Sequence, residues 1–157
     1  MKVVVAADTV AFLRSLPGFM ATRDGENRPT ACESILLELD PETGVGEVAA
    51  AARYARQMTE NLRDNGRFAL VVSRVWHDHR SAQIKGRCLG VQGPLQSPER
   101  VRPAIEGFAV MLETFNLPPR VVRDFRANEA DRWYLVRVQV EEVFDQTPGP
   151  GAGKRLS

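Results

Sequence analysis

The chain has 157 residues, with 21 basic and 20 acidic side chains and a formal net charge of +1. This length suits one domain with its own core, and the balanced charge argues against a nucleic-acid-binding or membrane-surface protein. Cys32 and Cys88 lie far apart without a CxxC spacing, which argues against a disulfide framework and a thiolate zinc site. Asp8 and Arg14 interrupt the apolar run at the N-terminus, so no signal peptide or membrane span is predicted, and we expect a soluble, cytoplasmic protein.

The first half of the chain predicts a short helix, three strands and a second helix. Helical spacing of apolar residues, strand-like alternation and turn-forming residues mark these elements. They are a helix that Asp8 or Thr9 caps and Pro17-Gly18 ends, two strands around a turn at 24–27, a strand over 45–50, and a helix over 51–65.

The second half predicts two strands, a third helix and a last strand. The run RFALVVSRV is rich in valine, which is typical of a strand buried on both faces. A polar turn, WHDHR, separates it from the next strand, and the last strand shows clear alternation of polar and apolar residues. The elements are strands over 67–75 and 80–95, a helix that Ser97 and Pro98 begin with a stripe of Val101, Ile105, Phe108, Leu112 and Phe115, and a strand over 131–144.

Six strands joined mostly by short links predict a mainly antiparallel α+β fold, in which the sheet closes into a small barrel with flanking helices. Residues 1–144 are predicted to form this single domain. The segment DQTPGPGAGKRLS, residues 145–157, is rich in glycine and proline, so we expect an extended arm or a disordered end, with disorder slightly favoured.

Four side chains share one face of the predicted second helix: Arg53, Arg56, Gln57 and Glu60. Two guanidinium groups beside the N–H groups of a helix N-terminus can hold a phosphate. The alternative is a solvated face on which Arg56 pairs with Glu60, four residues on, for about a few tenths of a kcal/mol. The sequence leaves both interpretations open, and the second is the more common one.

Gln83 and Lys85 point to the same face of the strand at 80–95, because side chains alternate along a strand. An amide beside an ammonium can serve a flavin-type ring, whose edge exchanges hydrogen bonds and whose anionic reduced form a cation stabilises. The alternative is a solvent-facing strand on which Lys85 discourages aggregation. The strand alone does not decide between the two.

Other motifs do not support a catalytic or metal site. His77 and His79 provide two imidazoles without a third ligand, so a polar turn is the preferred interpretation and no metal is predicted. Ser34 and Ser81 have no histidine at a recognisable spacing, which argues against hydrolase chemistry. No GxGxxG, P-loop or CxxC motif is present, and no catalytic acid or base can be named.

Several short motifs over roughly residues 10–95 occur together in one order: Ala21-Thr22, Asp24-Gly25, Arg28-Pro29, Asn61-Leu62, Asn65-Gly66-Arg67 and Gln83-Ile84-Lys85-Gly86. In order and spacing they resemble the pyridoxamine 5'-phosphate oxidase-like family of FMN-binding split β-barrels. Each motif is weak alone, and their joint order is what carries the resemblance.

The resemblance implies an obligate homodimer with FMN sites at the subunit interface. The expected phosphate contacts are Arg53, Arg56 and Gln57; Arg28, Thr30 and Ser34 could border the ring or the ribityl chain, with Ser81, Gln83 and Lys85 on a neighbouring strand. Relatives carry Ser-x-Lys or Ser-Arg-Lys at the helix start. This chain has Ala55, Arg56, Gln57 and Met58 there, so an arginine would have to replace the lysine.

The leading hypothesis is therefore a dimeric FMN-binding oxidoreductase acting on an unidentified small molecule. Vitamin B6 oxidation is not predicted, because Trp133 opens the last strand and a segment rich in glycine and proline follows it, unlike the tryptophan and Arg-Leu ending that pyridoxamine-phosphate oxidases use. One alternative is a deazaflavin-dependent reductase of the same fold. Another is a non-catalytic or haem-handling split-barrel binding protein that has lost FMN.

Overall fold

The computed structural model describes residues 3–121 and 133–157, and six strands dominate it. In chain order the elements are α1 (Ala7–Arg14), β1 (Gly18–Arg23), β2 (Pro29–Leu39), β3 (Val45–Ala51), the 3₁₀ helix η1 (Ala52–Tyr54), α2 (Ala55–Asp64), β4 (Arg67–Ser73), β5 (Ser81–Pro94), the 3₁₀ helix η2 (Pro98–Val101), α3 (Arg102–Glu113) and β6 (Trp133–Asp145).

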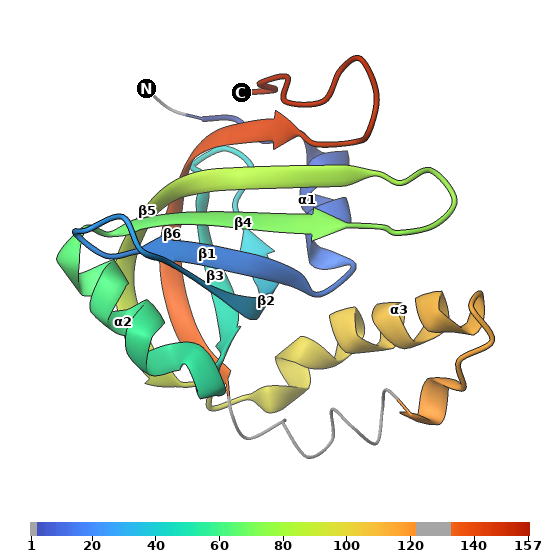
Figure 1. The fold of residues 1–157 in the computed structure, drawn as a ribbon, viewed down its shortest axis with the longest axis horizontal. Coiled ribbons are helices and arrows are strands. Elements are labelled where there is room, and N and C mark those ends of the chain that lie inside the picture. Colours follow the sequence, from blue (N-terminus) through green and yellow to red (C-terminus); the bar gives the residue numbers. More distant parts are fainter. Residues whose placement is uncertain (1–2, 122–132) are drawn as a thin grey trace.

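The strands form a closed antiparallel barrel in the order β1-β2-β3-β6-β5-β4, so the predicted six-stranded α+β barrel is confirmed (Figure 1). The two longest strands, β5 and β6, pair with three shifts of register. Such irregularities bend a strand, which helps a sheet of only six strands to close. Chain segments far apart in sequence thus share one continuous wall.

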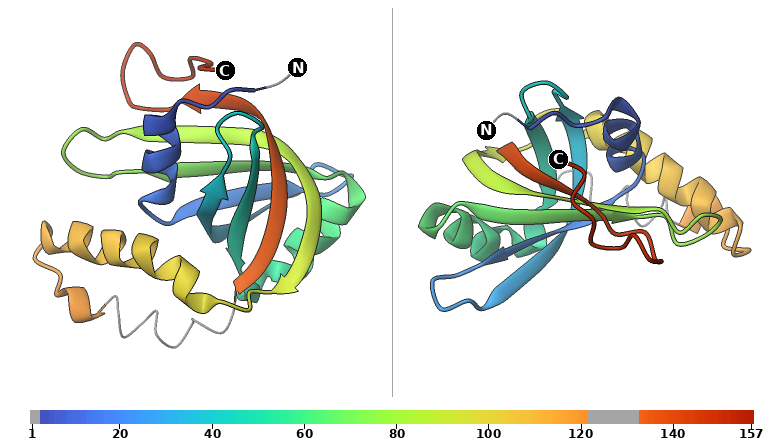
Figure 2. Two further views of the ribbon diagram at one scale, coloured as in Figure 1. Left: turned by 180° about the vertical axis from the view of Figure 1, so that it is seen from behind. Right: turned by 90° about the horizontal axis from the view of Figure 1, so that it is seen from above.

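Two hydrophobic clusters lie on opposite sides of this wall. The first fills the barrel, with Met20, Leu70 and Ile84 fully buried, and Met58 and Leu62 from α2 packing against it. The second lies outside the wall, where η2 and the first turn of α3 pack against the outer side of β2 and β3 (Figure 2). It contains Ile35, Leu37, Ala49, Ala51, Val101, Ala104 and Trp133. Burial on both faces explains the unbroken apolar run ILL within β2.

The helix starts differ from the prediction. No side chain caps α1: Ala6 precedes the helix, and its carbonyl accepts the N–H groups of Thr9 and Val10. Asp8 instead lies in the first turn and forms an ion pair with Arg80, with 3.0 Å between Oδ2 and Nη2. Ser97 does not cap a helix either, because the chain first makes the 3₁₀ turn η2.

Other boundaries also shift. The predicted helix over 51–65 begins only at Ala55, because Ala51 still pairs in β3 and η1 follows it. Phe115 lies beyond the end of α3 and is half exposed, so the predicted stripe ends before it. Of the last predicted strand, residues 131–132 lie outside the described residues, and the rest forms β6.

The C-terminal segment folds back on its own strand, which corrects the expectation of a disordered end. Leu156 N–H donates to the carbonyl of Val143 at 2.7 Å, and Arg155 forms a bridge with Phe144. The turn uses two glycines with positive φ, Gly149 and Gly153. Glycine-rich composition was misleading here because the same flexibility permits a tight turn.

Candidate functional site

Gln83 and Lys85, two of the predicted site residues, lie on the side of the sheet that faces away from the barrel core, along β1, β4, β5 and β6. Strand pairing aligns Phe19, Val71, Gln83 and Phe144 in one row across these four strands. The neighbouring row consists of Ala21, Ala69, Lys85 and Glu142. We call these eight residues the outer face; β4 and β5 are seen running along it in Figure 1.

Gln83 and Lys85 lie on this face as predicted by strand alternation, and both are half-buried. The Lys85 ammonium nitrogen stands 4.6 Å from the centre of the Phe144 ring, a cation–π contact. Gln146 Nε2 donates to Gln83 Oε1 at 3.3 Å. Each of the two polar side chains is therefore oriented by a residue from β6 or the segment after it.

Apart from Gln83, Lys85 and Glu142, the outer face is apolar. The side chain of Phe19 is 61% exposed, an unusual exposure for a phenylalanine on a central part of a sheet. Val71 and Phe144 continue the apolar row on either side of Gln83. An exposed aromatic and aliphatic strip with an amide and an ammonium beside it can hold a flat heteroaromatic ring.

Of the three side chains expected at a phosphate, Arg56 and Gln57 lie in the first turn of α2, whereas Arg53 lies in η1. Each of the three has a protein partner. Arg56 Nε donates to Glu60 Oε1 at 3.2 Å, which matches the alternative of a helix-face ion pair. Gln57 Nε2 donates to Asn61 Oδ1 at 3.0 Å. Arg53 stands 4.0 Å from the carboxylate of Glu33.

These ion pairs are weak competitors for a phosphate. The Arg56 side chain is 93% exposed, and exposed pairs contribute about 0–1 kcal/mol. A doubly charged phosphate would therefore displace Glu60 at little cost. Glu33 differs, because it lies buried on the outer side of β2, where it holds a negative charge close to Arg53.

The three candidates on β2 and the turn before it are not brought together. Ser34 is fully buried, with its Oγ donating to the carbonyl of Cys32, so it faces the core rather than the outer face. Thr30 lies opposite Thr22 near the end of the strand pair. Arg28 belongs to the turn, where Asp24 and Glu26 both pair with it, at 2.6 and 3.0 Å.

Ser81 begins β5 and lies two residues from Gln83, on the same side of the strand. Its hydroxyl donates to Ser73 Oγ at 2.9 Å, and Thr147 Oγ1 accepts its backbone N–H at 3.1 Å. The segment after β6 thus borders the same end of the outer face that Ser81 and Gln83 occupy.

Arg28 and Gln57 do line a common pocket of about 320 Å³, but its charge does not favour a phosphate. Its lining includes four carboxylates, from Asp24, Glu26, Glu60 and Asp64. Hydrogen bonds from the backbone and side chain of Arg28 lower the pKa of Asp24, which keeps that carboxylate charged. An anion would meet net negative charge there.

Sequence reasoning missed Phe19, Phe144 and Gln146. A signal for Phe144 was present in the alternation of the last strand, but its contact with Lys85 depends on the register of β5 against β6. Gln146 was assigned to the arm after residue 144, where no contact with the barrel was expected.

Three further observations concern the cysteines, metal binding and membrane-spanning helices. Burial raises the pKa of the thiols of Cys32 and Cys88, and neither forms a disulfide. Across residues 3–121 and 133–157, no group of three or more histidine, cysteine or acidic side chains could hold a metal ion. Within the same residues, no helix is long and apolar enough to cross a membrane.

Comparison with known proteins identifies the fold. No protein-family model matches the sequence, and no curated protein matches it. A candidate pyridoxamine 5'-phosphate oxidase from Lactobacillus delbrueckii superposes with a TM-score of 0.54 at 17% identity, covering 90% of this chain and 93% of the other. HupZ from Group A Streptococcus gives 0.52 at 13% identity, covering 96% and 100%.

A third structure is a protein related to general stress protein 26, of the pyridoxinephosphate oxidase family, from Clostridium acetobutylicum. Its TM-score is 0.50 at 12% identity, with 85% of this chain and 81% of the other covered. Identities this low establish a common fold and no common activity. In agreement with the resemblance seen in the sequence, the chain has the split β-barrel fold of pyridoxamine 5'-phosphate oxidase-like proteins.

Proposed function

We propose that the chain is an FMN-binding oxidoreductase that acts on a small organic molecule as a cytoplasmic homodimer. The observation that carries the proposal is the outer face, where Lys85 and Gln83 lie side by side on β5 and Val71 separates Gln83 from the exposed ring of Phe19. A ring bound there would lie against apolar side chains and meet one ammonium and one amide at its edge.

The outer-face residues fit a flavin ring in three ways. Lys85 would offset the negative charge of the reduced ring, and Gln83 would exchange hydrogen bonds with polar atoms at its edge. Phe19 and a second copy of the chain would exclude water from the ring. When bound, FMN supplies the acceptance and donation of hydride or single electrons.

At the phosphate end, Arg53 and Arg56 are the proposed contacts. Arg56 lies in the first turn of α2, whose backbone N–H groups also favour an anion, and Arg53 lies in η1 just before it. Binding would exchange the contact of Arg56 with Glu60 for a stronger, charge-assisted contact with the phosphate. A deazaflavin would use the same ring contacts.

A second candidate function is a haem-handling or otherwise FMN-free binding protein. The observation that favours it is the sequence at the helix start, Ala55-Arg56-Gln57-Met58, which lacks the lysine of the Ser-x-Lys or Ser-Arg-Lys motif. In this case the barrel is a scaffold, and the outer face takes a different flat ligand.

An absorbance spectrum of the purified protein, followed by titration with FMN, distinguishes these functions. Flavin bands, or saturation by FMN at micromolar concentrations, support the FMN-dependent enzyme; a Soret band supports the haem-handling protein. Binding of the deazaflavin F420 without binding of FMN supports the deazaflavin-dependent reductase. No binding of FMN at tens of micromolar contradicts the leading proposal.

Lys85→Met tests the ring contact directly. We expect FMN binding to weaken about tenfold, corresponding to about 1.4 kcal/mol, and the reduction potential of the bound flavin to fall because the reduced anion loses its cation. Lys154→Met is the matched control, since Lys154 is exposed in the C-terminal segment. If Lys85→Met and Lys154→Met had the same affinity for FMN and the same reduction potential of the bound flavin, the flavin ring would not contact Lys85.

A further inference from the structure

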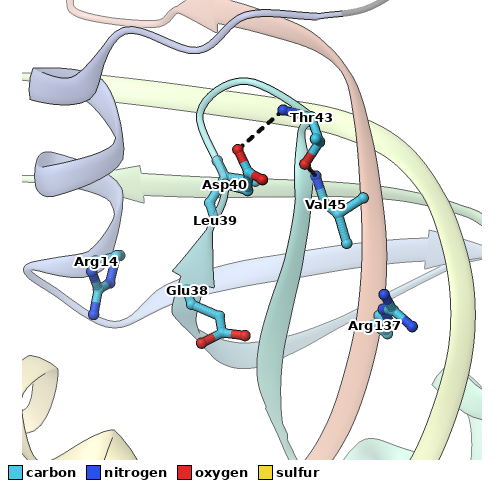
Figure 3. Close-up of a pocket in the computed structure, with 7 residues that line it drawn as sticks. All are labelled: Arg14, Glu38, Leu39, Asp40, Thr43, Val45 and Arg137. Atoms are coloured by element: carbon cyan, nitrogen blue, oxygen red, sulfur yellow. Dashed lines mark hydrogen bonds between the residues drawn. The ribbon is translucent and has the colours of Figure 1, made fainter.

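A pocket of about 500 Å³ lies on another side of the barrel, between the end of α1, the β2–β3 hairpin and β6. Two arginines line it: Arg14 from the last turn of α1 and Arg137 from β6. In Figure 3 they stand on opposite sides of the hairpin, with Glu38 between them. Asp40 and Thr43 complete its polar lining.

The negative groups of this pocket already have partners. Asp40 Oδ1 accepts the backbone N–H groups of Glu42 at 2.8 Å and Thr43 at 3.1 Å. The Glu38 carboxylate stands 3.6 Å from Nη2 of Arg100. Both carboxylates are thus partly neutralised by donors of the protein itself.

The two arginines differ from these carboxylates. Within residues 3–121 and 133–157, neither Arg14 nor Arg137 forms a hydrogen bond or an ion pair. The N–H groups of both guanidinium groups are therefore available to bind an anionic ligand in this pocket.

The scaffold that presents the arginines is rigid. Gln139 Nε2 donates to the Thr43 carbonyl at 2.8 Å, and the N–H of Val140 donates to the Gly44 carbonyl at 2.8 Å. These bonds fix the hairpin turn to β6, the strand that carries Arg137. Arg14 lies on a regular helix whose buried side packs into the barrel core through Leu13. The backbone positions that carry the two arginines are therefore fixed before a ligand binds.

We propose that this pocket binds a small dicarboxylate, with one carboxylate on Arg14 and the other on Arg137. A carboxylate brings one negative charge to each guanidinium and matches its two parallel donors. A phosphate brings nearly two charges, which Glu38 and Asp40 at the rim would repel more strongly. The proposal does not depend on flavin binding, because no residue of the outer face lines the pocket.

Calorimetric titration of the full chain with glutarate at fixed ionic strength tests the proposal. We expect saturable binding with one ligand per chain, weakened tenfold or more in Arg14→Gln and in Arg137→Gln. Arg63→Gln is the matched control, since Arg63 is an exposed arginine on α2 outside the pocket, and it should bind glutarate normally. Both pocket arginines are exposed, so their replacement should leave the unfolding temperature unchanged.

Acetate and inorganic phosphate complete the experiment. Acetate, with a single carboxylate, should bind at least tenfold more weakly than glutarate, because it reaches only one arginine. Equal binding of acetate, tighter binding of phosphate, or an unchanged affinity in either arginine variant would overturn the proposal. So would the absence of saturation by glutarate at millimolar concentrations.

Discussion

Met58, in the first turn of α2, lies inside the barrel, with its sulfur 3.6 Å from the Cys32 sulfur. The two sulfurs and the neighbouring Leu62 make this part of the core apolar. Position 58 therefore contributes to stability in this chain rather than to a phosphate contact.

A lysine at position 58 should destabilise the protein rather than improve cofactor binding. We expect Met58→Lys to lower the free energy of unfolding by about 3 kcal/mol or more, because an ammonium would be buried without a partner. Met58→Leu, which conserves volume, should cost less than about 1.5 kcal/mol. Urea unfolding measures both. A stable Met58→Lys variant that binds FMN more tightly would contradict the buried role of this position.

Asp78, in the turn between β4 and β5, links stability to pH. Hydrogen bonds from the Arg74 guanidinium, and then from the backbone N–H of Arg80, lower the pKa of its carboxyl group well below the usual value. A group whose pKa is lower in the folded chain stabilises the fold above its unfolded pKa of about 4. That contribution disappears as the pH falls toward the folded value.

We therefore expect Asp78→Asn to be less stable than the parent protein at pH 6, with the difference shrinking as the pH falls below about 4. Urea unfolding midpoints at pH 6, 4 and 3 measure this difference. Glu42→Gln, at another exposed turn position, should show a smaller effect at pH 6. A destabilisation of Asp78→Asn that is the same at all three pH values would mean that the charge is not its cause.

At the scale of elements, the close packing of β5 against β6 depends on Gly86. A Cβ atom at this position would come within 1.9 Å of the Gln139 carbonyl oxygen, at a point where the pairing of the two strands shifts register. Only a residue without a side chain allows this approach. Gly86 thus supports the barrel closure that sets the positions of Gln83 and Lys85.

Gly86→Ala should lower the free energy of unfolding by about 1–3 kcal/mol, because a backbone atom of β6 must move to make room. Gly90 lies on the same strand with nothing within 4 Å of its added Cβ, so Gly90→Ala should change stability by less than about 1 kcal/mol. Thermal or urea unfolding compares the two variants. If both variants lost the same free energy of unfolding, the close approach of Gly86 to Gln139 would not be the cause of the loss in Gly86→Ala.

At the scale of the whole molecule, the exposed outer face predicts self-association. If the resemblance to dimeric split barrels extends to assembly, a second copy would cover Phe19 and complete the ring site. Sedimentation equilibrium should then give twice the 17.4 kDa mass of one chain, with or without added flavin.

Phe19→Glu should shift this equilibrium toward the monomer, because a charge would be placed in an apolar interface. Val4→Glu is the control, since Val4 is 62% exposed but does not belong to the outer face. A parent protein that stays monomeric at high concentration would contradict the dimer. If Val4→Glu shifted the monomer–dimer equilibrium as much as Phe19→Glu, the outer face would not be the dimer interface.

The sequence by itself determined the fold class and most of the elements. Alternation and apolar runs mark all six strands, and such patterns follow directly from which side of a strand meets water. The same alternation placed Gln83 and Lys85 on one face of β5. Helix starts were less predictable, because backbone carbonyls such as that of Ala6 replaced the expected side-chain caps.

Only the tertiary structure decided which side of the wall each candidate residue occupies and what it contacts. Ser34 faces the core, Met58 fills it, and Phe144 reaches Lys85 from a strand more than fifty positions away along the chain. Likewise, Arg14 from α1 and Arg137 from β6 are far apart in the sequence but line the same pocket. Local patterns cannot specify these relations, because barrel closure and strand register are set by packing of the whole chain.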